Sequence, residues 1–183
     1  YSTSILKQFI NFADKNGLRF YPVHIELDTG MRRLGFDSQS LEELLELIPS
    51  DFINIISVFS HLAASEAPEH DDFTRKQISD YIEMCNSIRN KCQKDFIMHI
   101  LNSAGIQRFP EAQFDMVRLG IGLYGINPFV EQTKIEPVAT LRTIISQIKN
   151  IKAGDTIGYN REWKVNSDML IAVIPIGYAD GFP

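Results

Sequence analysis

The chain has 183 residues, of which 44% are hydrophobic and 22% are charged, and its net charge is -5. This size allows one domain with a sizeable core, or one domain and part of a second. The acidic balance argues against binding to nucleic acid, and no apolar run is long enough to predict a membrane-spanning helix.

Apolar residues at helical spacing predict three helices in the first part of the chain, over residues 4–15, 40–48 and 71–92. Short, nearly continuous apolar runs predict four strands, over residues 21–27, 54–59, 96–101 and 114–117. This alternation of strands and helices is typical of a parallel α/β sheet. The longest helix is expected to bury the side chains of one face, which are Phe73, Ile78, Tyr81, Ile82, Cys85, Ile88 and Cys92.

The pattern changes after Pro128. Three strand-like runs follow, separated by turns and without a helix, over residues 138–151, 155–159 and 169–176. We place the domain boundary near residues 128–135. Residues 1–130 then form the α/β domain, and residues 131–183 begin an all-β domain.

Cys85 and Cys92 are the only cysteines of the chain, and both lie on the predicted helix over residues 71–92. Seven residues of helix place their Cα atoms ~10 Å apart, which is too far for a disulfide. Two unpaired thiols indicate a reducing compartment such as the cytoplasm. The four histidines have no HxH or HExxH spacing, so we expect no metal site.

Polar residues follow each predicted parallel strand at its carboxyl end. These clusters are residues 28–33, 60–61, 102–105 and 118–122. In a (β/α) barrel such ends converge on one mouth, where active sites lie. Glycine-flanked backbone amides with a hydroxyl and cations suit a phosphate. The residues alone therefore predict a barrel enzyme that acts on an anionic ligand, for which a phosphorylated compound is one candidate.

Each of these features has a simpler structural explanation when it is taken alone. A single histidine after a strand, such as His61, is more often a hydrogen-bonded structural residue than a catalytic one. Arg32 is most simply a solvated charge, and residues 102–105 are most simply a loop. Residues 66–72 have the composition of a solvated loop and helix cap, and we assign them no function.

Four segments, in chain order, resemble alanine racemases. They are VHIELDTGMRRLGF (23–36), FSHLAASE (59–66), LNSAGIQRFPEAQFDMVRLGIGLYGINP (101–128) and IPIGYADGFP (174–183). The resemblance implies a pyridoxal-phosphate-dependent enzyme of fold-type III. Its fold would be part of a TIM-type (β/α)8 barrel followed by the start of an all-β C-terminal domain.

The resemblance implies interconversion of L- and D-alanine through an external aldimine with pyridoxal 5'-phosphate, by two bases, supplying D-alanine for peptidoglycan. The family forms homodimers whose active sites use both subunits. Tyr178 matches the tyrosine base that comes from the β domain of the other subunit. The second base is the lysine that holds the cofactor, and we expect it before residue 1. We therefore expect this chain to be an internal fragment that also lacks the end of the β domain. We expect the fragment to be unstable and inactive on its own.

The resemblance also assigns cofactor contacts to residues of this chain. Arg118 matches the arginine that faces the pyridine nitrogen, where a permanent cation disfavours protonation of that nitrogen. Ser103, Gly120 and Ile121 match the phosphate-binding set, and Asn102 is expected to shape that loop.

Three further residues match the substrate side of the family's site. Arg33 matches the arginine that contacts the substrate carboxylate and favours the phenolate form of Tyr178. His61 matches the histidine between Tyr178 and Arg118. Glu26 stands where many relatives have a carbamylated lysine, and we hypothesise that its carboxylate orients Arg33 instead. Glu26 could otherwise be a strand-end carboxylate with another partner.

Three alternatives remain open. A racemase of broader specificity would share the cofactor site. Non-catalytic carriers of pyridoxal phosphate have the same barrel but lack the β domain, so residues 135–183, and Tyr178 in particular, argue against them. Amino-acid decarboxylases of this barrel type have a β domain, but the segments over residues 101–128 and 174–183 favour the racemase.

Overall fold

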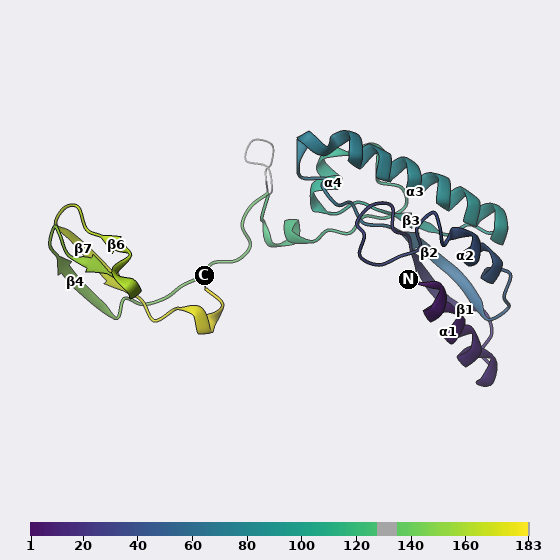
Figure 1. The fold of residues 1–183 in the computed structure, drawn as a ribbon, viewed down its shortest axis with the longest axis horizontal. Helices are drawn as coiled ribbons and strands as arrows, with labels where there is room; N and C mark the ends of the chain where they lie inside the picture. The colour runs from purple at the N-terminus through teal and green to yellow at the C-terminus, as the bar shows by residue number, and fades with distance from the viewer. Residues whose placement is uncertain (128–134, 183) are drawn as a thin grey trace. The chain divides into compact units, whose positions relative to one another are not determined.

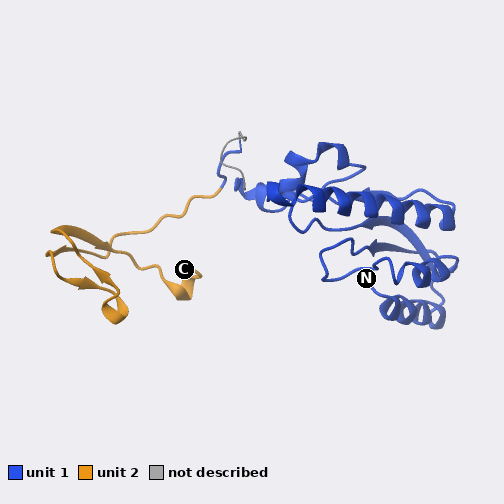
Figure 2. Cartoon of the chain, turned by 45° about the horizontal axis from the view of Figure 1, so that its top comes forward, with its two compact units in different colours: residues 1–138 blue, residues 139–183 orange. Residues whose placement is uncertain are grey.

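The computed structural model describes residues 1–127 and 135–182. The chain divides into two compact units, Tyr1–Val138 and Ala139–Pro183, which are coloured separately in Figure 2. The predicted domain boundary between residues 130 and 131 lies outside the described residues and stays a prediction. No helix in the described ranges is both long and apolar enough to cross a membrane.

Unit 1 is built on a parallel sheet in the order β1-β2-β3 (Figure 1). The strands are β1 (Tyr21–Glu26), β2 (Ile53–Phe59) and β3 (Ile97–His99). Both pairs are parallel, which confirms the arrangement that the alternating pattern predicts.

Helices precede and connect these strands. They are α1 (Thr3–Lys15), α2 (Leu41–Leu47), α3 (Asp71–Cys92) and α4 (Ser103–Arg108), with the short 3-10 turns η1 (Pro68–His70), η2 (Pro110–Ala112) and η3 (Ile121–Tyr124). The hydroxyl of Ser2 accepts from the Ile5 amide at the start of α1, and Asn16 caps its end. Asp71 and Asp72 lie in the first turn of α3, where the helix dipole favours negative charge.

The core lies between the helices and one face of the sheet. Tyr81, Cys85 and Ile88 of α3 are fully buried there, as the helical spacing predicts. The same prediction is wrong for Phe73 and Ile82, whose exposed fractions are 43% and 38%. A helix turns 100° per residue, so a side chain next to Tyr81 in sequence lies beside the buried stripe rather than within it.

Side-chain alternation in β1 and β2 separates an apolar face from a polar one. Ile25 of β1 is 2% exposed, under the helices. Its neighbours His24 and Glu26 therefore lie on the opposite face of the sheet. In the register of the sheet His24 pairs with Ser57, and Glu26 pairs with Phe59. Polar side chains of two strands are thus brought together on the face that the helices do not cover.

The strand predicted over residues 114–117 is wrong. Phe114 has a φ of 45°, which interrupts an extended conformation. The carboxylate of Asp115 accepts the Met98 amide at 2.8 Å, and the Asp115 amide donates to the Met98 carbonyl at 3.2 Å. A side chain thus takes the place of one backbone acceptor beside β3. The segment nevertheless follows β3, because the Arg118 amide donates to the Leu101 carbonyl at 3.0 Å.

Unit 2 contains two antiparallel pairs of strands. β4 (Gln147–Ile151) pairs with β7 (Met169–Val173), and β5 (Thr156–Ile157) pairs with β6 (Trp163–Lys164). The 3-10 turns η4 (Tyr159–Arg161) and η5 (Tyr178–Asp180) complete the unit.

The long strand predicted over residues 138–151 forms only in its last part. Residues 138–146 have no regular secondary structure. The amide of Ser146 donates to the carbonyl of Val173, the last residue of β7. Among the residues that the structure describes, those before Ser146 therefore have no neighbouring strand with which to pair.

Tyr81 connects α3 to both neighbouring strands. Its hydroxyl donates to the Val58 carbonyl at 2.7 Å and accepts the His99 amide at 2.8 Å, and burial raises the pKa of the phenol. Tyr81→Phe would leave both backbone groups without a partner in a buried site. We expect it to lower the free energy of unfolding by about 1–3 kcal/mol.

Urea unfolding of the purified protein would measure this loss. Tyr159→Phe is the matched control, because Tyr159 is 92% exposed and its removal should change stability by less than about 0.5 kcal/mol. Equal stability of the two variants would contradict the connecting role of Tyr81.

Candidate functional site

The guanidinium of Arg118 is held at the carboxyl edge of the sheet. Its Nη1 donates to His99 Nδ1 at 2.5 Å and to the His99 carbonyl at 3.2 Å. Its Nη2 donates to the Ser60 carbonyl at 2.5 Å and lies 3.4 Å from His61 Nδ1. The guanidinium also lies over the Phe59 ring, 5.2 Å from its centroid. These contacts occupy both terminal nitrogens, and within residues 1–127 and 135–182 no acceptor is found for Nε–H, which can therefore donate to a ligand.

His99 is a neutral partner for this cation. Its side chain is 5% exposed, and its ring stacks on Phe59 with the centroids 5.2 Å apart and the planes 6° apart. Burial lowers the pKa of His99 to about 4, and the neighbouring charges of Arg118 and His24 act in the same direction. The positive charge of this group of side chains therefore resides on Arg118.

His61 lies on the loop that follows β2. Burial, with the charges of Arg118 and Arg33, lowers the pKa of His61 below its ordinary value, so its imidazole is largely neutral near pH 7. Gln77 of α3 fixes this loop, because its amide nitrogen donates to the His61 carbonyl at 3.2 Å and its amide oxygen accepts from the Ala63 amide at 2.9 Å. The fully buried Gln77 thus fixes the backbone of the loop that carries His61.

The hydroxyl of Ser103 organises the turn over residues 120–122. It accepts the backbone amide of Gly120 at 2.9 Å and that of Gly122 at 3.1 Å. A serine oxygen has two lone pairs, and both are used here. The hydroxyl proton must therefore be donated elsewhere, and an oxygen of an anionic ligand is a suitable acceptor. This donor set fits a phosphate group.

Asn102 and its neighbours hold this region together. The Asn102 side-chain oxygen accepts from the Ser65 hydroxyl at 2.8 Å and from the Gly105 amide at 2.9 Å, which caps α4. Arg108 donates to the Ser65 carbonyl at 2.8 Å and to the Asp71 carboxylate at 2.6 Å. The loop after β2 and the helix after β3 are thereby tied to each other.

These elements surround a cavity of about 460 Å³. It is lined by the side chains and backbone of His61, Glu66, Asn102, Ser103, Ala104, Arg118, Leu119, Gly120 and Ile121. Six of the predicted site residues therefore meet in one place, although they come from three separate segments of the sequence. The cavity offers a hydroxyl donor, backbone amides, a cation and a neutral imidazole.

Glu26 and Arg33 are placed near this group but are not joined to each other. In the described part of the chain no ion pair links the two side chains, and Arg33 is exposed. The charge of Glu26 instead raises the pKa of Arg118, against the larger lowering by burial. The hypothesis that Glu26 orients Arg33 therefore stays a prediction.

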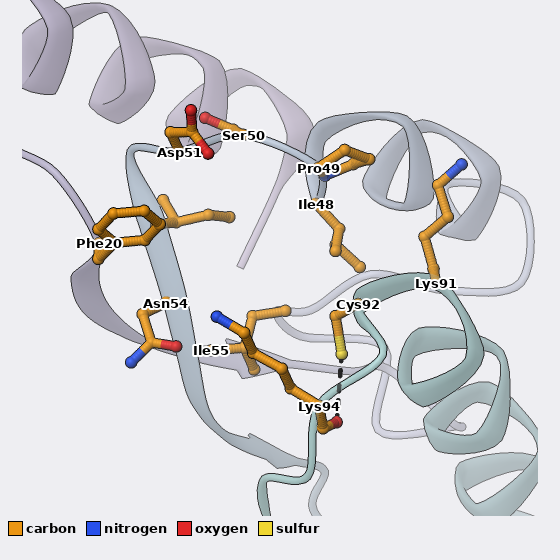
Figure 3. Close-up of a pocket in the computed structure, with 11 residues that line it drawn as sticks. Phe20, Ile48, Pro49, Ser50, Asp51, Asn54, Ile55, Lys91, Cys92 and Lys94 are labelled. Carbon is orange, nitrogen blue, oxygen red and sulfur yellow. Dashed lines mark hydrogen bonds between the residues drawn. The ribbon is translucent and has the colours of Figure 1, made fainter.

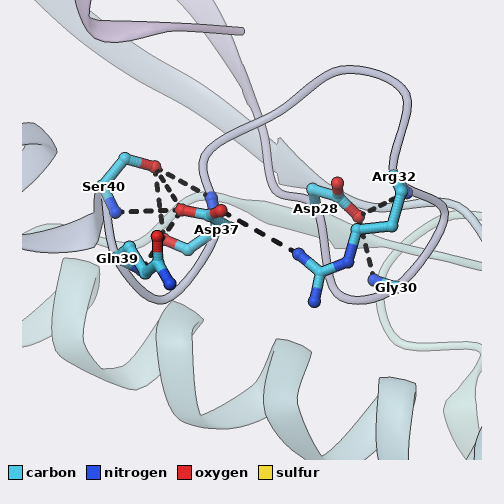
Figure 4. A network of polar contacts seen from close by, with 6 residues as sticks. All are labelled: Asp28, Gly30, Arg32, Asp37, Gln39 and Ser40. Atoms are coloured by element: carbon cyan, nitrogen blue, oxygen red, sulfur yellow. Dashed lines mark hydrogen bonds and ion pairs between the residues drawn. The ribbon is translucent and has the colours of Figure 1, made fainter.

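The loop that carries Arg33 is shaped by polar contacts of its own (Figure 4). The carboxylate of Asp28 accepts the amides of Gly30 at 2.9 Å and Arg32 at 3.0 Å. Arg32 also lies 3.9 Å from the Asp37 carboxylate, and its side chain is 72% exposed. A solvated role for Arg32 fits this exposure. Gly35 has a φ of 116°, and a Cβ there would lie 2.6 Å from the Asp28 nitrogen, so only glycine fits.

Tyr178 belongs to unit 2 and lies in η5. The turn is closed by the Asp180 carboxylate, which accepts the Gly177 amide at 3.0 Å, and Gly181 follows with a φ of 77°. The side chain of Tyr178 is 83% exposed. This tight turn thus presents a phenol to its surroundings.

A second hollow lies at the opposite, amino-terminal edge of the sheet (Figure 3). It has a volume of about 170 Å³, and its lining includes Phe20, Ile55 and Lys94. The Cys92 thiol donates to the Lys94 carbonyl there, at 3.3 Å. This edge is remote from the residues that we predict for the site, and both cysteines are free thiols, as their spacing predicts.

The sequence analysis missed the residues beneath Arg118. On the face of the sheet that the helices do not cover, a line of hydrogen bonds joins Arg118 to His99, Ser57 and His24. The sequence did contain a sign of this arrangement. Each of the three strands carries a polar side chain, His24, Ser57 or His99, that alternation places on the same face of the sheet. Which of those side chains meet depends on the register of the sheet.

The fold and the cavity define an α/β protein whose ligand cavity lies at the carboxyl edge of a parallel sheet. Residues 1–128 match the family model "Alanine racemase, N-terminal domain", and residues 138–183 match "Alanine racemase, C-terminal domain". The chain therefore belongs to the alanine racemase family. Unit 1 is part of a TIM-type barrel, and unit 2 is part of the C-terminal β domain.

Individual relatives agree with this assignment. The alanine racemase of Clostridium tetani is 38% identical over all of this chain, which covers 48% of that protein. The alanine racemase structure from Bacillus anthracis with bound L-Ala-P has a TM-score of 0.79 at 30% identity, over 99% of this chain and 48% of that one. The Bartonella henselae structure, with covalently bound pyridoxal phosphate, has a TM-score of 0.77 at 30% identity, over 100% and 49%. The chain thus spans about half the length of these relatives.

The neutral state of His99 predicts a pH dependence of stability. Its pKa is about 4 in the folded protein and 6.5 ordinarily, so between these values the unfolded chain binds more protons. Stability should therefore fall as the pH is lowered from 6.5 to 4. His99→Asn should reduce the slope of the free energy of unfolding against pH by the contribution of up to one proton. Urea unfolding at a series of pH values would measure this slope. The same slope in both proteins would contradict the assignment.

Proposed function

We propose that the protein containing this chain is an alanine racemase that interconverts L- and D-alanine with pyridoxal 5'-phosphate and supplies D-alanine for peptidoglycan. One observation supports this above others. The Ser103 hydroxyl, whose proton is free to be donated, and the backbone of Gly120 and Ile121 share one cavity with the guanidinium of Arg118.

The described residues fit the cofactor at both of its ends. Ser103 and the backbone of Gly120 and Ile121 would hold its phosphate, with Asn102 shaping the loop. Arg118 would face the pyridine nitrogen, and its positive charge would keep that nitrogen unprotonated. When bound, pyridoxal phosphate stabilises the electron pair left on the substrate Cα after proton removal. An unprotonated ring stabilises it less, which would suppress side reactions such as transamination.

Proton transfer would use side chains of this chain on one face of the substrate. Tyr178 would remove or return the Cα proton from the β domain of a partner subunit, to which its exposure suits it. His61, which is neutral, would orient Tyr178 and connect it to Arg118. Arg33 would bind the substrate carboxylate and favour the phenolate of Tyr178. The second base, a lysine that holds the cofactor, is expected outside residues 1–183.

This chemistry implies a homodimer, because the two faces of the substrate are served by different subunits. We also propose a cytoplasmic location, which the two free thiols support. A broader amino-acid racemase is the first alternative, since it would share the cofactor contacts. A non-catalytic carrier of the cofactor is the second, and the presence of unit 2 with Tyr178 argues against it.

Proton exchange tests the proposal directly. The full-length protein would be incubated with pyridoxal phosphate and a mixture of L-amino acids in heavy water, and loss of each α-proton followed by NMR. We expect exchange confined to alanine, with D-alanine appearing. Exchange across several amino acids would favour the broader racemase, and none despite bound cofactor would favour the carrier. Tyr178→Phe should abolish the D-alanine signal, whereas Tyr159→Phe should not.

Glu26→Gln tests whether this carboxylate replaces a carbamylated lysine. If Glu26 orients Arg33, the variant should raise the KM for alanine by about tenfold, the effect of about 1.4 kcal/mol of lost substrate binding, with a smaller change in kcat. Steady-state kinetics of the full-length enzyme would measure it, with Glu43→Gln on the exposed side of α2 as the control. Unchanged kinetics would mean that Glu26 has another partner.

A further inference from the structure

A line of hydrogen bonds runs from Arg118 along the face of the sheet that the helices do not cover. His99 Nε2 lies 3.1 Å from the Ser57 hydroxyl oxygen, and the same oxygen lies 2.6 Å from His24 Nδ1. Ser57 is 1% exposed and His99 is 5% exposed. The three side chains come from β3, β2 and β1, so the line crosses the whole described sheet of unit 1.

The position of each proton in this line follows from its first member. A guanidinium has only donors, so the Nδ1 of His99 must accept from Arg118. A neutral imidazole carries one proton, which then lies on Nε2 and is donated to the Ser57 oxygen. When His24 is neutral and carries its proton on Nε2, the Ser57 hydroxyl in turn donates to His24 Nδ1. Each of these hydrogen bonds thus has one donor and one acceptor. The reverse direction would place two protons between His99 Nδ1 and Arg118 Nη1.

The ring of His99 is also fixed from its other sides. Its backbone amide donates to the Tyr81 hydroxyl at 2.8 Å, and its ring stacks on Phe59, over which the Arg118 guanidinium lies. Ring rotation is therefore restricted by packing, so Nδ1 stays directed at Arg118 and Nε2 at Ser57. Ser57 is the group there that the described residues provide.

We propose that Ser57 and His24 are positioning residues: they fix His99 as the neutral Nε2–H tautomer and thereby hold Arg118 against the site. The consequence of this positioning for catalysis rests on the proposed function, in which the Nε–H of Arg118 faces the pyridine nitrogen in one orientation. Without the hydroxyl of Ser57, the buried Nε2–H would lose its acceptor, and a tautomer that repels Arg118 would become accessible.

The tautomer can be measured without the cofactor and without turnover. Full-length protein labelled with ¹⁵N-histidine would be prepared free of cofactor, and the ring nitrogens assigned by long-range ¹H–¹⁵N NMR. We expect His99 to show a protonated Nε2 and an unprotonated Nδ1 between pH 5 and 8. Ser57→Ala should produce averaged ring shifts or faster exchange of the Nε2 proton, and Ser57→Thr, which keeps the hydroxyl, should restore the original pattern. A protonated Nδ1 in the unmodified protein would overturn the proposal.

Kinetics of the holoenzyme then test the link to Arg118. Ser57→Ala and His24→Ala should each lower kcat by about three- to tenfold, the equivalent of one lost hydrogen bond, with little change in KM. Because both act through His99, the double variant should be no slower than the slower single variant. His70→Ala and Ser87→Ala, which remove the same side-chain types from an exposed and a half-buried position outside the site, should leave kcat unchanged.

The two readouts separate the two proposals. The expected NMR pattern in a protein without racemase activity would refute the proposed function and support the role of Ser57 and His24 in fixing His99. An active racemase whose His99 tautomer is unaffected by Ser57→Ala, or whose two single effects simply add, would refute the positioning role alone.

Discussion

The site depends on the partly buried guanidinium of Arg118. Removing a cation from water is costly unless its donors find acceptors. Here the acceptors are the carbonyls of Ser60 and His99 and the Nδ1 of His99, all at the carboxyl ends of two adjacent strands. These acceptors are uncharged, so the positive charge is satisfied without being neutralised. The histidines beside it are kept neutral by burial and by the same cation, so Arg118 carries the positive charge among these side chains.

The rest of unit 1 places these acceptors. Parallel strands bring Ser60 and His99 to the same edge, and α3 holds both through Tyr81 and Gln77. The chain then leaves β3 into α4, whose first residue is Ser103. The Ser103 hydroxyl gathers the backbone of the glycine-rich turn after Arg118. The cation and the phosphate-type donor set are therefore positioned by the same strand, and a change in the sheet would displace both.

Unit 2 contributes a different kind of element. Its turn over Tyr178–Asp180 is closed by its own carboxylate and backbone, and it exposes the phenol. The anion-binding groups of unit 1 and the phenol of unit 2 are each formed within one unit. The two elements lie in the parts of the chain that match the N-terminal and the C-terminal alanine racemase domains, respectively.

Much of this could be predicted from the sequence, because hydrophobic periodicity and chain order are local properties. They identified α1, α2, α3 and the three parallel strands of unit 1 but not α4, whose first residues were read as a loop, and four motifs indicated the family. They were wrong for residues 114–117, where the Asp115 side chain replaces a backbone acceptor, and for residues 138–146, which have no strand beside them. The line His99–Ser57–His24 was not predicted, because alternation assigns a side chain to a face but not to a partner. Only the register of the sheet decided which polar groups meet beneath Arg118, since each hydrogen bond joins residues far apart in sequence.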